Sequence, residues 1–237
     1  MTSYSDIFFD LDRTLWDFDR NSAETLNELY ESYSLKNELE IENSVFIQSF
    51  RDVNASEWRE FRKGTKTKEE LRENRFIKTF LKYGSDDIVK ARELSFEYTK
   101  NCPYKTHLVD GAQELLESLY DKYNIHIITN GFSEIQHIKI DSSGIRKYFK
   151  EVIISEDTPY RKPQREIFYE GIKRAKTTFK RSIMIGDDWK SDIQGAYRAG
   201  MDQIFYNPQN KAVVEKGKST YEIRKLIEIE EIITSTN

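Results

Sequence analysis

Short, mostly apolar runs without regular polar alternation recur along the chain. They occupy Ile7–Phe9, Ile125–Ile128, Val152–Ile154, Ile183–Ile185 and Ile204–Phe205, and amphipathic segments separate most of them. Strands that alternate with helices are typical of βαβ units around a parallel sheet. Strands covered by helices on both faces lack polar alternation. The pattern therefore predicts an α/β fold with a three-layer, Rossmann-like core around a parallel sheet.

A different pattern lies between the first and second of these strands. From about Phe18 to Thr99 the apolar residues keep helical spacing, as at Leu26, Leu29 and Tyr33, which predicts four or so helices. All four prolines and eight of the ten glycines lie beyond residue 102. One strand alone cannot form a stable sheet, so an insertion into one α/β domain is favoured over two sequential domains.

This interpretation divides the chain into a core of residues 1–15 and 103–237 and an all-helical insert of residues 16–102. Two segments fit a capping box, in which the first and fourth side chains satisfy unpaired backbone amides. They are Asn21–Glu24 and Thr67–Glu70. Each is expected to begin a helix of the insert.

Composition narrows the chemistry. The 237 residues carry a formal net charge of -4 and a single cysteine, Cys102, which excludes an intramolecular disulfide. One thiol and three histidines cannot form a Cys/His zinc site, so a metal would have oxygen ligands. The acidic balance argues against a nucleic-acid partner. No apolar stretch is long enough for a membrane span, and Met1–Asp6 does not resemble a signal peptide, which predicts a cytoplasmic protein.

Polar residues follow four of the expected strands. In open α/β sheets, ligands bind at the carboxyl ends of the strands, so these residues are expected to converge. The segments are Asp10-Leu-Asp12-Arg-Thr14, Thr129-Asn130-Gly131, Lys162-Pro163 and Gly186-Asp187-Asp188 with Asp192.

The grouped residue types indicate phosphoryl chemistry. Carboxylates held close together repel, and hard carboxylate oxygens suit Mg²⁺. A lysine, a hydroxyl and glycine-turn amides neutralise a phosphoryl group. Asp10 and Asp12 are expected to share a side of an extended strand, where one can attack phosphorus while the other transfers protons. Taken singly, each aspartate could be a turn or cap residue and Lys162 a surface lysine, but their order after the strands favours a site.

These four motifs together resemble the haloacid dehalogenase superfamily of phosphohydrolases. The insert after the first motif is similar to that superfamily's helical cap. The stretch Leu11–Leu26, with Trp16-Asp-Phe-Asp-Arg-Asn21, resembles the subgroup of pyrimidine 5'-nucleotidases. Arg13 departs from the family pattern, where a small or acidic residue is more common, and its charge could alter the substrate preference.

The resemblance implies roles for individual residues. Asp10 would be the nucleophile that forms an aspartyl-phosphate, and Asp12 the acid and base. The phosphoryl oxygens would be bound by Thr129 and Lys162 with help from Asn130 and Gly131. The metal, Mg²⁺, would be held by Asp10, the backbone carbonyl of Asp12 and Asp187, with Asp188 or Asp192 supporting it from outside. Substrate contacts near the insert would come from Trp16, Phe18 and Asn21.

The expected activity is Mg²⁺-dependent hydrolysis of a small phosphorylated metabolite, with a pyrimidine nucleoside 5'-monophosphate favoured. Alternative substrates are a sugar phosphate, phosphoglycolate or a sialic acid phosphate. Haloacid dehalogenation is less favoured, because Asp12 is not needed when halide leaves. A binding module without catalysis is less favoured as well, because the motifs are intact. The sequence does not indicate an oligomeric state.

Overall fold

The computed structural model describes residues 4–210, 212 and 219–235. The chain divides into two compact units, one of Met1–Phe18 with Thr106–Asn237 and one of Asp19–Lys105. We call them the α/β unit and the helical unit. The boundaries expected from the sequence, after residues 15 and 102, lie three residues before these. That the helical unit acts as a cap stays a prediction.

A six-stranded parallel sheet forms the centre of the α/β unit, with strand order β3-β2-β1-β4-β5-β6. The strands are β1 (Asp6–Phe9), β2 (Asn124–Thr129), β3 (Phe149–Ile154), β4 (Ser182–Gly186), β5 (Asp202–Tyr206) and β6 (Tyr221–Ile223). The α/β fold with a parallel sheet is thereby confirmed. All five expected strands are present, and β6 was not expected.

Strand β1 lies inside the sheet, where it pairs with β2 on one side and β4 on the other. Its residues Ile7, Phe8 and Phe9 are fully buried. This explains why its sequence is apolar on both faces. The ladder continues just past the strand, since Asp10 N donates to Ile185 O at 2.8 Å.

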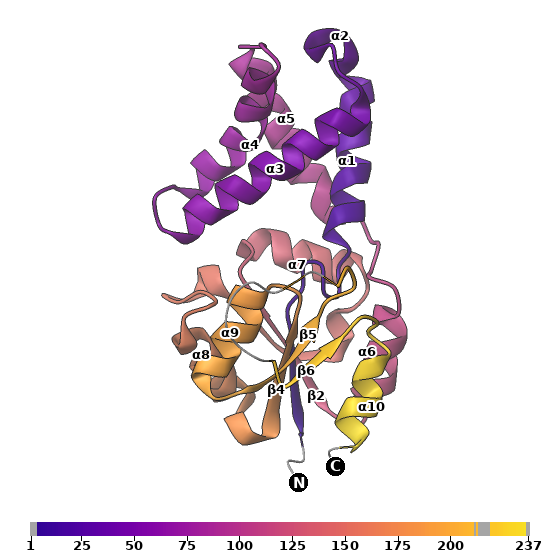
Figure 1. Ribbon diagram of the computed structural model, residues 1–237, viewed down its shortest axis with the longest axis vertical. Helices are drawn as coiled ribbons and strands as arrows, with labels where there is room; N and C mark the ends of the chain where they lie inside the picture. The colour runs from indigo at the N-terminus through magenta and orange to yellow at the C-terminus, as the bar shows by residue number, and fades with distance from the viewer. Residues whose placement is uncertain (1–3, 211, 213–218, 236–237) are drawn as a thin grey trace. The chain divides into compact units, whose positions relative to one another are not determined.

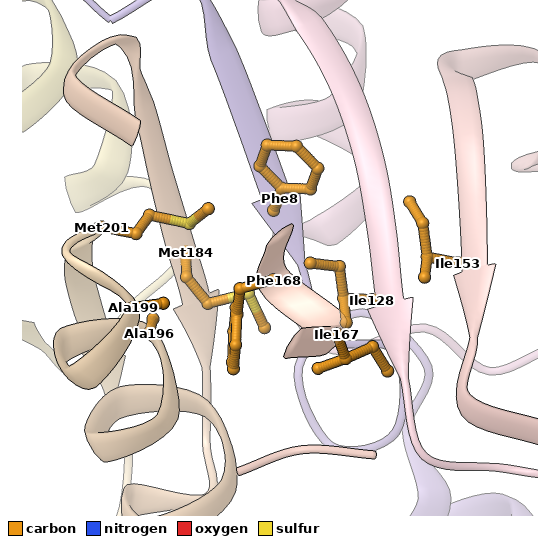
Figure 2. Packing of buried hydrophobic residues seen from close by; sticks show 9 residues of the cluster. All are labelled: Phe8, Ile128, Ile153, Ile167, Phe168, Met184, Ala196, Ala199 and Met201. Carbon is orange, nitrogen blue, oxygen red and sulfur yellow. The ribbon is translucent and has the colours of Figure 1, made fainter. Parts of the chain in front are cut away.

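Helices cover both faces of this sheet, α8 and α9 on one and α6 and α10 on the other (Figure 1). The helices of the α/β unit are α6 (Ala112–Tyr120), α7 (Ser133–Ser142), α8 (Arg165–Ala175), α9 (Gln194–Ala199) and α10 (Glu228–Ser235). Figure 2 shows the core under α8 and α9, where Phe8, Ile128 and Met184 from the strands meet Phe168. Burying one such side chain contributes about 1.5–3 kcal/mol.

The helical unit contains four longer helices and one single-turn helix. They are α1 (Phe18–Ser32), α2 (Leu35–Leu39), α3 (Asn43–Arg62), α4 (Lys68–Lys82) and α5 (Ile88–Asn101). Aromatic rings join three of them: the centroid of Phe50 on α3 lies 4.8 Å from that of Phe76 on α4 and 5.0 Å from that of Tyr98 on α5. The expectation of four or so helices agrees with this arrangement.

Only one of the two expected capping boxes forms. Thr67 caps α4, and the reciprocal Glu70 bond is present. The other expectation was wrong, because α1 begins at Phe18 and Asn21 lies inside it. Ser22 beside it is buried and accepts a hydrogen bond from the Tyr98 hydroxyl at 2.8 Å. The first turn of α1 is already formed by Phe18–Asn21, so no helix begins at Asn21 for its side chain to cap.

Within the described residues, no helix is both long enough and apolar enough to cross a membrane.

Candidate active site

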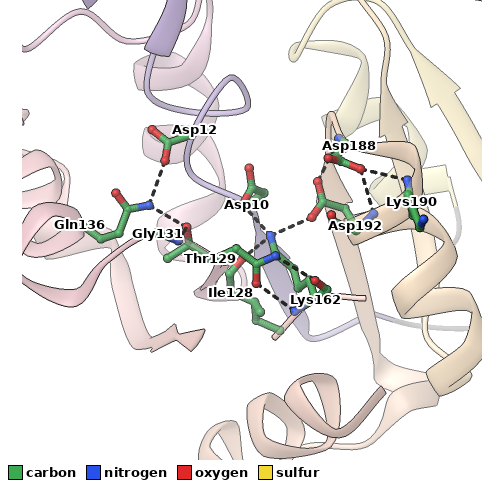
Figure 3. A network of polar contacts seen from close by, with 12 residues as sticks. Asp10, Asp12, Ile128, Thr129, Gly131, Gln136, Lys162, Asp188, Lys190 and Asp192 are labelled. Carbon is green, nitrogen blue, oxygen red and sulfur yellow. Dashed lines mark hydrogen bonds and ion pairs between the residues drawn. The ribbon is translucent and has the colours of Figure 1, made fainter. Parts of the chain in front are cut away.

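Lys162 is the central cation of the site at the carboxyl edge of the sheet (Figure 3). It lies in the loop before α8, is almost fully buried, and places its Nζ 2.6 Å from Asp10 Oδ1 and 2.7 Å from Ile128 O. The same atom lies 2.7 Å from Asp192 Oδ1. An ammonium group has three donors, and three oxygens surround this one. The strand ends thus bring together residues that are far apart in sequence.

Burial and charge act against each other on Lys162. Burial disfavours its charged form, but the Asp10 and Asp192 carboxylates outweigh this effect and hold the pKa of Lys162 above its ordinary range. For Asp10, burial is the larger effect and raises the pKa of the carboxyl, while Lys162 partly offsets it. The two carboxylates therefore favour the charged form of Lys162.

Three carboxylates lie together at this sheet edge, and two of them contact Lys162. Asp187 follows the end of β4, and ligand oxygens of Asp10, Asp187 and Asp192 lie within 4.8 Å of one another. Burial and the neighbouring carboxylates raise the pKa of Asp187 well above its ordinary value. Burial also raises the pKa of Asp192, to about 7. Three acids and one lysine leave an excess of negative charge, so this oxygen donor set fits a hard divalent cation such as Mg²⁺.

Asp188 and Asp192 have different surroundings, which the sequence left open. Asp188 caps the π-helical turn Trp189–Ile193, and its carboxylate accepts from the N–H groups of Lys190 at 3.0 Å and Ser191 at 2.9 Å. Asp192 lies within that turn and faces Lys162. A Cβ on Gly186 would lie 2.2 Å from Asp192 Oδ2, so only glycine leaves room for this carboxylate.

The Thr129-Asn130-Gly131 segment follows β2 and mostly supports its neighbours. Asn130 Nδ2 donates to Lys162 O at 2.9 Å, and Lys162 N donates to Asn130 Oδ1 at 2.9 Å. Gly131 N donates to Thr129 Oγ1 at 3.3 Å. Asn130 and Gly131 were expected to help bind the phosphoryl group, and this stays a prediction. In the structure Asn130 bonds to the backbone of Lys162, and Gly131 N donates to Thr129 Oγ1.

Asp12 does not lie on a strand, so the expected period-two relation to Asp10 was wrong. Strand β1 ends at Phe9, and Asp12 belongs to a turn that forms an isolated bridge to Trp16. Arg13 in this turn has a φ of 68°, and its N–H donates to Trp16 O at 2.8 Å. The sheet register cannot orient Asp12 here, so its direction depends on other contacts.

Those contacts come from two α7 residues that the sequence analysis missed. Gln136 Nε2 donates to Asp12 Oδ2 at 3.0 Å and to Thr129 Oγ1 at 2.7 Å. Lys139 Nζ donates to Asp12 Oδ1 at 2.5 Å. Both side chains are buried. Their spacing of three residues on a helix that directly follows Thr129-Asn130-Gly131 is the signal that could have revealed them.

The three residues expected to contact the substrate, Trp16, Phe18 and Asn21, have different surroundings. Trp16 is fully buried, and Lys139 Nζ lies 4.3 Å from its ring centroid and 5.7 Å from that of Phe18. Arg13 Cζ lies 4.5 Å from the Phe18 centroid. Such distances are typical of cation–π contacts. Trp16 therefore offers no free ring face to a nucleobase, and Asn21 is buried inside α1.

Known proteins are similar to this chain in both sequence and fold. The sequence profile described as haloacid dehalogenase-like hydrolase matches residues 7–206. The chain belongs to this family. The expected family is thus confirmed, and the protein is a hydrolase of that family.

Three relatives of this family align along nearly the whole chain. YfnB of Bacillus subtilis, named as a HAD-hydrolase, is 32% identical, with 100% of this chain and 98% of YfnB aligned. The pyrimidine 5'-nucleotidase PynA of Streptococcus pneumoniae is 32% identical over 93% of this chain and 91% of its own. The pyrimidine 5'-nucleotidase YjjG of Escherichia coli is 29% identical over 96% of both. The expected resemblance to pyrimidine 5'-nucleotidases is confirmed.

A crystal structure of YfnB, described as bound to magnesium, has the same fold. It matches with a TM-score of 0.86 at 30% identity and covers 98% of this chain and 99% of YfnB.

Proposed function

We propose that this protein is a Mg²⁺-dependent phosphomonoester hydrolase that forms an aspartyl-phosphate on Asp10. The main support is the contact of Lys162 with both Asp10 and Asp192, beside a third carboxylate, Asp187. A carboxylate nucleophile next to a fixed cation is suited to attack an anionic phosphate ester, since the cation offsets charge on the ester.

The proposed Mg²⁺ ligands are Asp10, Asp187 and the backbone carbonyl of Asp12. Asp192 lies close enough to Asp10 and Asp187 to be a further candidate ligand of Mg²⁺. Asp188 instead caps the π-helical turn. When bound, Mg²⁺ would supply positive charge that screens the phosphoryl oxygens from these carboxylates.

In the first step, an oxygen of the Asp10 carboxylate attacks phosphorus. The bond from phosphorus to the alcohol oxygen breaks, and protonated Asp12 donates its proton to that oxygen, so the alcohol leaves neutral. The Lys162 ammonium and the Thr129 hydroxyl donate hydrogen bonds to the phosphoryl oxygens. The products are the free alcohol and an aspartyl-phosphate on Asp10.

In the second step, the Asp12 carboxylate removes a proton from water while the water oxygen attacks phosphorus. The bond between phosphorus and the Asp10 oxygen breaks, and inorganic phosphate leaves. Asp10 is again a carboxylate and Asp12 is again protonated, so the cycle is complete.

Asp12 favours ester hydrolysis over haloacid dehalogenation. A halide leaves without a proton, whereas an alcohol needs one. Two α7 side chains hold the Asp12 carboxylate beside Thr129, where a departing alcohol oxygen could be protonated.

We infer that the substrate is a pyrimidine nucleoside 5'-monophosphate, which the names of PynA and YjjG support. A metabolite panel with phosphate release as the readout tests this inference. UMP, dUMP and TMP should have the highest kcat/KM, and chelation of Mg²⁺ should remove the activity. Efficient hydrolysis of a sugar phosphate, phosphoglycolate or a sialic acid phosphate, without hydrolysis of the nucleotides, would contradict the nucleotide as substrate. It would leave the proposed phosphatase activity intact.

A further inference from the structure

The side chain of Gln136 joins two groups of the site. Its amide nitrogen, with two hydrogens, lies 3.0 Å from Asp12 Oδ2 and 2.7 Å from Thr129 Oγ1 (Figure 3). The amide nitrogen faces Asp12, whose Oδ2 can accept its hydrogen bond before and after Asp12 gives up its proton. The two hydrogens are then donated to two different groups, one to Asp12 and one to Thr129.

This arrangement fixes the direction of the Thr129 hydroxyl. A hydroxyl has one hydrogen and two lone pairs. Thr129 Oγ1 accepts from Gln136 Nε2 at 2.7 Å and from Gly131 N at 3.3 Å, which uses both lone pairs. Its hydrogen is left to donate, which is the role that binding of a phosphoryl oxygen requires.

Asp12 is held from two directions. Gln136 binds Oδ2 and Lys139 binds Oδ1, so the plane of the carboxylate is fixed. Lys139 is in turn enclosed, because its Nζ lies over the rings of Trp16 and Phe18. The turn that carries Asp12 lies outside the sheet, so these two contacts replace the orientation that a strand would have given.

Gly131 provides the space that this arrangement needs. A Cβ at this position would lie 2.3 Å from Gln136 Cδ, which is far inside van der Waals contact. The backbone φ of Gly131 is not in the left-handed region, so close approach explains the glycine better than backbone conformation does.

We propose that Gln136 and Lys139 are positioning residues of the reaction. Lys139 orients Asp12, and Gln136 orients Asp12 and Thr129 together. This inference rests on the proposed function, because it assigns the support of the proton-transfer and phosphate-binding groups.

The leaving group offers a direct test. The 5'-oxygen of a nucleoside needs a proton in order to leave, whereas p-nitrophenolate leaves without one, so only the nucleotide depends on Asp12 as an acid. The ratio kcat/KM reports the steps up to departure of the alcohol and excludes the later attack of water. Comparing the two esters by kcat/KM therefore isolates proton donation by Asp12.

Replacing Lys139 should lower kcat/KM for one ester much more than for the other. Lys139→Met is expected to lower kcat/KM for UMP about 10- to 100-fold and to change the value for p-nitrophenyl phosphate by less than about threefold. Because water attack also needs Asp12, the variant should release p-nitrophenolate in a burst before a slow steady state. Lys147→Met, at an exposed lysine beyond α7, is the matched control and should match the wild type on both esters.

Replacing Gln136 should give a second pattern. Gln136→Met is expected to show the same preference and an additional loss on both esters, because Thr129 loses its fixed direction as well. Retained activity on p-nitrophenyl phosphate would show that Lys139→Met is folded, and a wild-type melting temperature would show the same for Gln136→Met.

Three results would contradict parts of this account. Equal losses on the two esters in Lys139→Met, or no loss on either, would overturn the positioning role of Lys139. Identical patterns in the two variants would overturn the link from Gln136 to Thr129. A wild type that cleaves neither ester would contradict the proposed function itself, and the positioning roles would fall with it.

Discussion

Two buried clusters of lysine and carboxylate have opposite charge ratios. In the helical unit, Glu57 on α3 is fully buried and forms ion pairs with two lysines, Lys66 and Lys78. Burial acts to raise the pKa of Glu57, but the hydrogen bonds from the two lysines outweigh it and lower the pKa. Lys78 remains half exposed to water, with 49% of its side chain accessible. The buried carboxylate of this cluster is therefore compensated by the chain itself.

The active-site cluster has one buried lysine for three carboxylates. Lys162 contacts Asp10 and Asp192, and Asp187 lies beside them. The pKa values of all three carboxyls are raised, with burial as the largest cause. A stable protein can bury compensated charges, but an uncompensated excess costs free energy unless a cation binds. The comparison separates a structural ion cluster from a site prepared for a metal and an anionic substrate.

After loss of the nucleophile Asp10, the largest effect is expected when the lysine of the active-site cluster is removed. Lys162→Met leaves Asp10 and Asp192 without their cation, so kcat/KM for UMP should fall by at least about 10³-fold. Steady-state kinetics would measure this loss. Lys150→Met, an exposed lysine on β3, is the control and should retain wild-type activity. A loss below tenfold would show that Lys162 is not needed at the reacting phosphate.

A smaller loss is expected when the support of Lys162 is removed. Asn130→Ala removes both hydrogen bonds to the Lys162 backbone, so the loop should loosen while the ammonium stays available. We expect kcat/KM to fall about 10- to 100-fold, as for other residues that orient a functional group. Asn37→Ala, at an exposed position on α2, is the control. An effect equal to that of Lys162→Met would mean that Asn130 contacts the substrate directly.

The compensated cluster should respond in stability and not in catalysis. Glu57→Gln removes the charge that pairs with two lysines, and the free energy of unfolding should fall by about 1–3 kcal/mol. Denaturant unfolding would measure this change. The value of kcat/KM at 25 °C should stay at the wild-type level. Lost activity in a variant of unchanged stability would contradict the distinction between the clusters.

The smallest effect is a pH-dependent stabilisation by Mg²⁺. Carboxyls with a raised folded-state pKa favour the folded protein while they are protonated, and this contribution is lost as the pH rises through their folded pKa values, about 7 for Asp192. Mg²⁺ needs the ionised groups, so it competes with protons. Saturating Mg²⁺ should raise the melting temperature by about 5 °C at pH 8 and by less at pH 5. Equal shifts at both pH values would argue against these carboxylates as ligands.

The strands, and the meeting of Asp10, Lys162 and Asp187 near one sheet edge, could be predicted because their signals are local. Buried parallel strands read as apolar runs, and the polar residues that follow β1, β2 and β4 mark one sheet edge. The sheet then brings Lys162 to Asp10 across 152 positions of sequence. Strand β6 was not predicted because it has only three residues at the edge of the sheet, and the central one, Glu222, is exposed.

Other features depend on tertiary contacts that no local pattern carries. The sequence suggested a strand through Asp12, but the chain leaves the sheet after Phe9, so α7 orients this carboxylate instead. The spacing of Gln136 and Lys139 places them on one face of α7, but only the fold shows that both are buried and contact Asp12. Trp16 looked available for stacking, yet its ring is buried under Lys139.

Phosphate release by Asp10→Asn tests the central claim most directly. The variant lacks the attacking carboxylate, so Mg²⁺-dependent release of phosphate from UMP should fall to the background rate while the protein stays folded. Removing one charge from a crowded acidic site should not lower its melting temperature. Asp141→Asn, an exposed aspartate on α7 that pairs with Arg146, should release phosphate as fast as the wild type. Release by Asp10→Asn at the wild-type rate would contradict the mechanism.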